Sequence, residues 1–197
     1  MTRKELFILI AFFVFIGPRP SDFYLLNNKY FIGLAPIIVI SLIGYCMRED
    51  IILTDYNKIL KSRQNVMAYF NCFQFSIYAQ AATSIIFGTS VGAYDGILDS
   101  FAIMPVYAVI IAPIAEEIVY RKIIFSFLSK FMNFWIASSI SSTIFALGHF
   151  NLNRFIGYFI TGMIFCYFYK KSQSILPMMA AHSSINFISL LVTTLRG

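Results

Sequence analysis

The sequence predicts an all-α protein: a polytopic transmembrane bundle of about seven helices, within a range of six to eight. Of its 197 residues, 59% are hydrophobic and only 12% are charged, and the mean hydropathy is +0.76. A soluble domain carries about 25% charged residues, roughly twice this share. The composition therefore indicates an integral membrane protein, and repeated apolar segments indicate several crossings of the bilayer.

Seven apolar segments follow one another along the chain. Most approach the ~20 residues that a helix needs to cross the hydrocarbon core, while the first and sixth are shorter. The segments cover residues 6–17, 31–47, 65–88, 101–128, 133–150, 155–169 and 175–195. The first follows Arg3 and Lys4 as a signal peptide would, but no small-residue cleavage site comes after it. We therefore expect it to stay as a span or a partly buried anchor.

A charged stretch, DIILTDYNKILKSR at residues 50–63, separates the second and third segments. Its apolar residues recur at helical spacing, so we expect an amphipathic helix lying on the membrane surface. We predict a single integral membrane domain, because no internal repeat or second domain is evident. Within it, residues 1–100 form N-terminal transmembrane helices with this interfacial helix, and residues 101–197 form the transmembrane core.

The basic residues predict the orientation of the bundle. The net charge of +6 does not indicate a nucleic-acid partner, because the basic residues cluster between apolar segments, where they orient a membrane protein. With a cytoplasmic N-terminus, four basic residues fall outside (Arg19, Lys29, Arg154 and Arg196). The other eleven fall inside: Arg3, Lys4, Arg48, Lys58, Lys61, Arg63, Arg121, Lys122, Lys130, Lys170 and Lys171. The outer loop 88–100 has none. This asymmetry predicts an N-in, C-out bundle.

The three cysteines and most of the acidic residues carry no functional signal. Cys46, Cys72 and Cys166 all lie in apolar segments without paired or CxxC spacing, so neither a disulfide nor a cysteine metal site is predicted. Seven of the nine acidic residues lie outside the spans or at their ends. Only Glu116 and Glu117 lie inside.

Both glutamates and both histidines, His149 and His182, lie within apolar segments. A charged side chain at mid-bilayer costs about 2.5–3.5 kcal/mol even on lenient insertion scales, so such residues normally face an interior cavity and one another. Glu117 and Arg121 are four residues apart with the acid first, which favours an ion pair within one helix. Glu116 lies about 100° around that helix and can point elsewhere.

The two later helices repeat the four-residue spacing. Phe145 precedes His149 by four residues, and His182 precedes Asn186 by four, so each pair shares one face of a helix. Structural explanations exist for each feature alone: a histidine bonded to a backbone carbonyl, or a Glu–Arg pair that braces helices. The clustered serines are expected to allow close helix packing: Ser138, Ser139, Ser141 and Ser142. The joint pattern on three helices favours one shared polar site.

These residues resemble the motifs of the CPBP family, the Abi or CAAX-protease-like group. EEIVYR fits EExxxR, FALGH fits FxxxH and HSSIN fits HxxxN, in this order within the last four segments. The group includes the eukaryotic prenyl-protein endopeptidase and bacterial bacteriocin-processing and self-immunity proteins. The resemblance covers roughly residues 101–190. The matching positions are Glu116, Glu117, Arg121, Phe145, His149, His182 and Asn186.

The resemblance implies an intramembrane endopeptidase. Peptide hydrolysis needs a base that activates water and a donor that holds the oxyanion. By resemblance, Glu116 is the base, oriented with His149, and Glu117 is a support fixed by Arg121. His182 and Asn186 would bind the oxyanion.

The cofactor question stays open at this point. Members of the group have been described both as metalloproteases and as metal-free glutamate proteases. A divalent metal such as zinc could be held by Glu116, His149 and His182, leaving a fourth position open. The same side chains could also act without a metal, and we slightly favour that mechanism.

Other functions are weighed against proteolysis. The chain has no HExxH and no GxSG motif, which argues against the usual zinc and serine protease designs. The expected substrate is a small membrane-associated peptide or a lipidated protein, such as a bacteriocin or pheromone precursor, cleaved at a bacterial plasma membrane among its lipids. One alternative is a non-enzymatic immunity protein that binds bacteriocin. Another is a proton-coupled transporter, although no inverted repeat is visible.

Overall fold

The computed structural model describes residues 1–15, 29–88 and 104–196, and this part of the chain is helical with no strand, as the sequence predicts. Most of the predicted outer loop 88–100 lies outside the described residues. The first five helices are α1 (Arg3–Phe15), α2 (Lys29–Cys46), α3 (Arg48–Leu53), α4 (Tyr56–Lys61) and α5 (Arg63–Phe87). The C-terminal elements are α10 (Phe134–Leu147), η4 (Leu152–Arg154), α11 (Phe155–Ser172) and α12 (Leu176–Arg196).

The predicted apolar segments correspond in order to the long helical elements, but the number of membrane crossings stays a prediction. Within the described ranges, one helix is both long and apolar enough to cross a bilayer by length and composition, at Leu176–Leu195 of α12. Leu34–Cys46 and Phe134–Leu147 are apolar but shorter. Large apolar side chains are exposed at many places, including Trp135 near the start of α10, 69% exposed. Such a surface suits contact with lipid.

The predicted interfacial helix at residues 50–63 is divided into two short helices, α3 and α4. Thr54 is extended between them, and the Asp55 side chain accepts a hydrogen bond from the backbone N–H of Lys58 at 3.0 Å. An aspartate in this position caps a new helix and competes with continuation of the preceding one. The aspartate therefore starts a second helix where the apolar spacing alone predicted one continuous helix.

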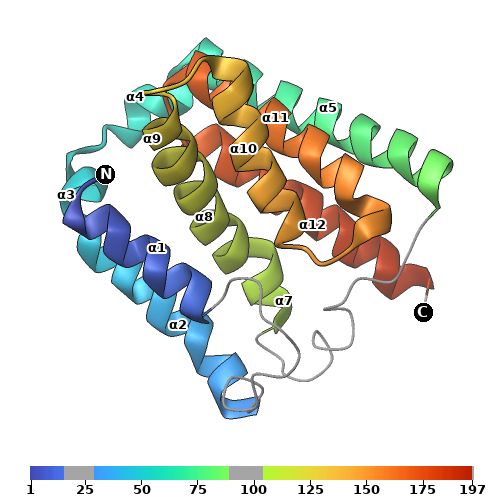
Figure 1. Cartoon of the computed structure of the whole chain (residues 1–197), viewed down its shortest axis with the longest axis horizontal. Coiled ribbons are helices and arrows are strands. Elements are labelled where there is room, and N and C mark those ends of the chain that lie inside the picture. The colour runs from blue at the N-terminus through green and yellow to red at the C-terminus, as the bar shows by residue number, and fades with distance from the viewer. Residues whose placement is uncertain (16–28, 89–103, 197) are drawn as a thin grey trace.

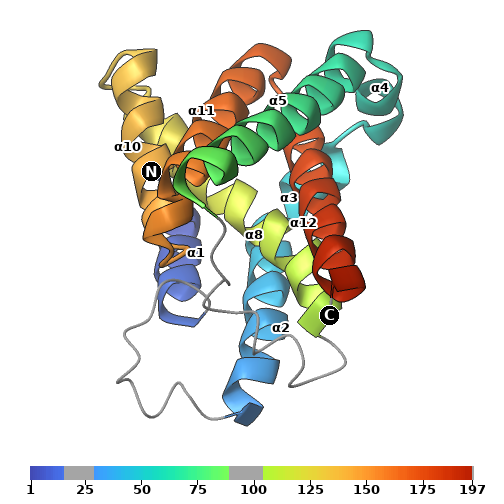
Figure 2. The ribbon, with the colours of Figure 1, turned by 90° about the vertical axis from the view of Figure 1, so that its right-hand side faces the viewer.

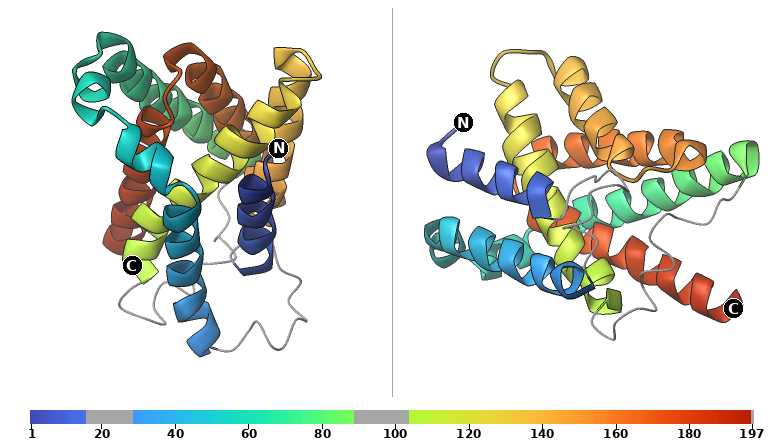
Figure 3. Two further views of the ribbon diagram at one scale, coloured as in Figure 1. Left: turned by 90° about the vertical axis from the view of Figure 1, so that its left-hand side faces the viewer. Right: turned by 60° about the horizontal axis from the view of Figure 1, so that its bottom comes forward.

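Residues 104–128 form one rod, here called the motif helix, because it carries Glu116, Glu117 and Arg121. It consists of α7 (Met104–Val106), η2 (Tyr107–Ile111), α8 (Ala112–Glu117), η3 (Ile118–Phe125) and α9 (Ser126–Leu128). Both η2 and η3 have the wide π-helical hydrogen-bonding pattern, which is rare and frequent at functional sites. The motif helix crosses the middle of the bundle (Figures 1 and 3).

Two apolar clusters pack the bundle, and the first of them includes the motif helix. One cluster joins it to α1, α2 and α10, through residues that include Phe12, Val39, Val119 and Phe145. The other joins α5, α11 and α12. Figure 1 shows α1 and α2 on one side of the motif helix and α5, α10, α11 and α12 on the other. The polar residues of the motif helix therefore lie between two apolar layers.

Small residues bring α10 and α11 close together. A Cβ atom on Gly162 of α11 would lie 2.7 Å from the Ser142 side chain of α10, closer than packed atoms allow. Ser138, Ser141 and Ser142 are all buried in this part of α10. Close approach through glycine and serine is typical of helices in membranes. This contact fixes α10, and with it His149 at its C-terminal end, against α11.

Candidate active site

Glu117 and Arg121 form the ion pair that their spacing predicts, and both are fully buried. Arg121 Nη1 lies 3.0 Å from Glu117 Oε1, and their side chains are 1% and 0% exposed. Two aromatic rings enclose the guanidinium, with Phe145 of α10 at 4.3 Å and Phe165 of α11 at 5.1 Å from Arg121 Cζ to the ring centroids. Arginine stacks on rings because its planar cation is weakly hydrated. Arg121 is therefore wedged where α10 and α11 meet the motif helix.

His182 of α12 contacts both glutamates of the motif helix. Its Nδ1 lies 2.9 Å from Glu117 Oε1, a hydrogen-bond distance, and its Nε2 lies 3.7 Å from Glu116 Oε2. Because a carboxylate only accepts hydrogen bonds, we assign the Nδ1 hydrogen to the bond with Glu117. This leaves Nε2 facing Glu116. The distance of 3.7 Å is too long for a direct hydrogen bond.

The second histidine occupies a different position from the one expected for it. We expected His149 to orient Glu116, but within the described residues no hydrogen bond or ion pair joins them. His149 Nδ1 instead donates to the backbone carbonyl of Phe145 at 2.9 Å, and its ring stacks on Tyr158 of α11 with centroids 3.9 Å apart. With Nδ1 engaged, Nε2 is the ring atom left for other partners.

Phe145 separates the two imidazoles and holds both. Its ring centroid lies 4.7 Å from that of His149 and 5.8 Å from that of His182, with both contacts edge-on. The same ring covers Arg121, as described above, and is only 1% exposed. The phenylalanine of the FxxxH motif is therefore a spacer at the centre of the site, and replacing it with a smaller residue would loosen three polar side chains at once.

Asn186 has a structural partner that follows from a proline. Its Nδ2 donates to the backbone carbonyl of Ala108 at 2.9 Å. In a helix this carbonyl would accept from the N–H of residue 112 or 113. The Ala112 N–H bonds instead to the carbonyl of Tyr107, and Pro113 has no N–H. The proline and the π-helical turn thus free the Ala108 carbonyl, and Asn186 satisfies it while one amide hydrogen remains available.

This account predicts energetic coupling between Pro113 and Asn186. Asn186→Leu leaves the Ala108 carbonyl unpaired and should cost about 1–3 kcal/mol of unfolding free energy. In a Pro113→Ala background the new N–H at position 113 can supply the missing donor. In that background, Asn186→Leu should therefore lower the unfolding free energy by about 0.5–3 kcal/mol less than it does in the parent. Unfolding of the four proteins of the double-mutant cycle in detergent measures this difference. Ser189→Ala, one helical turn further on, is the control and should add independently of Pro113→Ala. Additive effects of Pro113 and Asn186 would contradict the account.

A cavity of about 220 Å³ brings the later motifs together. Phe145, His149, His182 and Asn186 all line it, with residues of α5 and α11 completing the wall. Glu116 does not line this cavity, although its carboxylate lies next to the Nε2 of His182 and its side chain is 20% exposed. The structure therefore gathers the predicted site residues around His182, with the ion pair of Glu117 and Arg121 behind it.

Residues 98–188 match the family model for type II CAAX prenyl endopeptidase Rce1-like proteins. This segment contains all the residues of the three motifs described above. The chain is similar to Rce1-like proteins over this segment, which is less than half of its length. It is also 34% identical over 90 residues to "Putative membrane peptidase YdiL" of Bacillus subtilis (strain 168), a match over 46% of this chain and 37% of the relative. The match thus spans well under half of that relative. No solved structure gives a significant match.

The described residues do not present a ready three-ligand metal site. No group of three or more His, Cys, Asp or Glu side chains in the described ranges is arranged to hold a metal ion. Glu116 Oε2 and His182 Nε2 are the two neighbouring donors, at 3.7 Å. His149, the third predicted ligand, stacks on Tyr158 instead. Zinc usually takes at least three protein ligands. The side chains in this arrangement therefore do not fit a zinc ion that would bind the attacking water.

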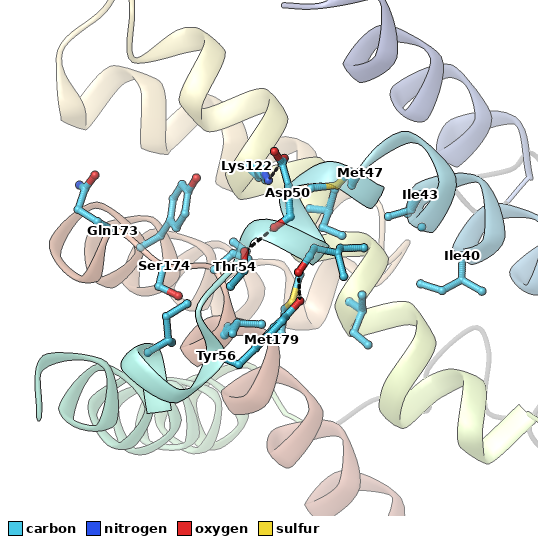
Figure 4. Close-up of a pocket in the computed structure, with 18 residues that line it drawn as sticks. Ile40, Ile43, Met47, Asp50, Thr54, Tyr56, Lys122, Gln173, Ser174 and Met179 are labelled. Atoms are coloured by element: carbon cyan, nitrogen blue, oxygen red, sulfur yellow. Dashed lines mark hydrogen bonds and ion pairs between the residues drawn. The ribbon is translucent and has the colours of Figure 1, made fainter. Parts of the chain in front are cut away.

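A larger cavity, of about 520 Å³, lies on another face of the motif helix, and Figure 4 shows its lining. Its walls are mostly apolar, with Ile114 and Ile118 from the motif helix and Met179 from α12. Lys122 reaches across its rim to Asp50 of α3 at 2.7 Å. None of the motif residues lines it. It therefore belongs to the packing of α3 and α4 against the core and not to the polar site.

Sequence reasoning missed the aromatic and polar residues that complete the site on α11. Tyr158 stacks on His149, Phe165 covers Arg121, and Thr161 lines the cavity. Tyr158, Thr161 and Phe165 follow one another at spacings of three and four residues, so they share one face of α11. That spacing is present in the sequence. Aromatic residues in a membrane segment usually face lipid, however, so the spacing alone does not indicate a site.

Proposed function

We propose that this protein is an intramembrane endopeptidase that uses Glu116 to activate water and hydrolyses a peptide bond of a small membrane-associated or lipidated substrate. The match of residues 98–188 to the Rce1-like family model supports the reaction class. The observation that carries the proposal is the contact of His182 with both glutamates, because it joins EExxxR to HxxxN beside a cavity that also holds His149 and Asn186. We propose that the site works at a bacterial plasma membrane.

The chemistry can be assigned to the atoms of this site. A water molecule beside Glu116 Oε2 and His182 Nε2 would donate a hydrogen bond to each, leaving an oxygen lone pair for the scissile carbonyl carbon. As the C–O bond forms, the water proton passes to Glu116. The free amide hydrogen of Asn186 can donate to the oxyanion. Glu116 then returns the proton to the leaving amine as the C–N bond breaks.

Glu117 and Arg121 are supports in this scheme. Glu117 accepts the Nδ1 hydrogen of His182 and so fixes the ring orientation that directs Nε2 toward Glu116. Arg121 balances the charge of Glu117 in a region where an unpaired carboxylate would be costly. We therefore expect these two residues to act through His182 and not on the substrate.

The test compares the parent with His149→Ala and His182→Ala after purification of each in detergent. Membrane insertion and monodispersity are checked first. Cleavage of a mixture of synthetic hydrophobic peptides is then followed by mass spectrometry. We expect His182→Ala to lose about 10²–10⁴-fold in rate, the usual contribution of one acid–base group. Parent-like cleavage by His182→Ala would refute the proposed site.

A chelator arm and a cell arm complete the test. Treatment with a chelator followed by added zinc measures metal dependence, and we expect cleavage to survive the chelator. The alternative function, bacteriocin immunity by binding alone, predicts a different result. In that case cells would stay protected when Glu116, His149 and His182 are each replaced by alanine, although the purified parent cleaves no peptide.

A further inference from the structure

A second cavity adjoins the one that contains the two histidines. It has a volume of about 320 Å³ and shares five lining residues with the first: Gln80, Arg154, Tyr158, Ser189 and Thr193. The shared residues come from α5, η4, α11 and α12. Figure 2 shows α5, α11 and α12 side by side in this part of the bundle. A substrate chain could therefore extend from His149 and His182 along both cavities.

Arg154 is the charged residue of this extended space. It is partly buried and lines both cavities, whereas no Asp or Glu among the described residues lines either one. Its backbone N–H is held by the Asn151 side chain at 3.2 Å. Within the described ranges its guanidinium makes no hydrogen bond, ion pair or ring contact. An arginine that lines a cavity without a counter-charge from the described residues favours an anionic ligand.

A second observation points to a polar ligand in the same place. Thr161 lines the cavity of the two histidines and is only 3% exposed, yet its hydroxyl has no hydrogen-bond partner among the described residues. Buried hydroxyl groups normally have a partner, because an unmade hydrogen bond is costly there. A peptide group or an ordered water in the cavity would supply one.

We propose that Arg154 binds a carboxylate of the peptide substrate, and this inference rests on the proposed endopeptidase function. The guanidinium and a carboxylate match as two parallel hydrogen bonds. The carboxylate belongs either to the free C-terminus of the substrate or to an acidic side chain near the cleaved bond. A lipid phosphate is disfavoured because Arg154 lines the same cavity as His149 and His182, whereas a head group would stay at the rim.

The test measures binding separately from cleavage. A fluorescently labelled hydrophobic hexapeptide is made with a C-terminal acid, with a C-terminal amide, and as an amide with one internal glutamate or glutamine. Binding of each peptide is titrated to the parent, Arg154→Gln and Arg154→Lys in phosphatidylcholine nanodiscs. Arg63→Gln, an exposed arginine on α5 that lines neither cavity, is the matched control. Cleavage is followed in parallel.

We expect a carboxylate peptide to bind the parent about tenfold more tightly than its neutral partner, as charge-assisted hydrogen bonds allow. The preference should vanish in Arg154→Gln, persist in part in Arg154→Lys and remain in Arg63→Gln. The acid–amide pair tests the C-terminus, and the Glu–Gln pair tests the side chain. An equal affinity of the parent for charged and neutral peptides, or a preference that survives in Arg154→Gln, overturns the inference.

Two further results separate this inference from its alternatives. If the parent shows the carboxylate preference at Arg154 but cleaves no peptide, the inference stands and the proposed function fails. If the parent cleaves and Arg154→Gln keeps the same ratio of acid to amide cleavage, the function stands and the inference fails. If phosphatidylglycerol stabilises the parent and the loss of this stabilisation is the only effect of Arg154→Gln, then Arg154 binds lipid. The inference is overturned in that case as well.

Discussion

Glu116→Gln is expected to reduce peptide cleavage by about 10²–10⁴-fold while leaving the protein folded. The glutamine keeps the size of the side chain but is a poor proton acceptor, so water beside His182 Nε2 loses its base. Glu116 is partly exposed and lies 3.7 Å from that nitrogen, so the change leaves no buried charge unpaired. The measurement is the single-turnover cleavage rate of the peptide that the parent cleaves best.

The control for this experiment is Glu49→Gln. Glu49 is exposed on α3 and forms a long contact, of 3.7 Å, with Lys4. The Glu49→Gln variant should cleave the peptide at the parental rate. That result would rule out a general effect of removing one carboxylate. If Glu116→Gln retained more than about a tenth of the parental rate, less than one acid–base contribution would be lost and Glu116 could not be the base.

The second large effect is expected on stability. Glu117→Met or Arg121→Met should each lower the unfolding free energy by about 3–5 kcal/mol, because each leaves its partner as an unpaired buried charge. Both side chains are at most 1% exposed, and they are 3.0 Å apart. In the double variant neither charge remains, so its loss should be clearly smaller than the sum of the single losses. Unfolding in mixed detergent micelles measures all three.

An exposed ion pair on the same helix is the matched comparison. Lys122 and Asp50 are 2.7 Å apart, but their side chains are 31% and 61% exposed. Asp50→Ala should therefore cost no more than about 1 kcal/mol. If the losses from Glu117→Met and Arg121→Met simply add in the double variant, the two residues are not a coupled pair, and the support assigned to them is wrong.

Local spacing predicted part of this arrangement well. The pair of Glu117 and Arg121 depends only on two positions one turn apart, and such contacts can be predicted from a sequence. The apolar segments likewise predicted the helices, because burial against lipid or protein repeats along each segment. The break between α3 and α4 was missed because a single capping side chain, Asp55, outweighed the apolar spacing.

Contacts between helices could not be predicted in the same way. His182 is 65 residues from Glu117, and which face of α12 it occupies depends on the rotation of the whole helix. The hydrogen bond from Asn186 to the Ala108 carbonyl depends in addition on Pro113, which has no N–H to donate to that carbonyl. We expected His149 beside Glu116, and the structure has His182 there, because Tyr158 and the carbonyl of Phe145 hold His149.

The place of Trp135 has a practical consequence for all of these variants. It is the sole tryptophan of the chain, and it sits at the start of α10, 69% exposed. The 14 residues of α10 span roughly 20 Å, and His149 lies beyond the far end. Tryptophan fluorescence, excited selectively, therefore comes from a single emitter remote from the histidines. Quenching by brominated lipid can report the depth of that emitter without interference from substitutions at the glutamates.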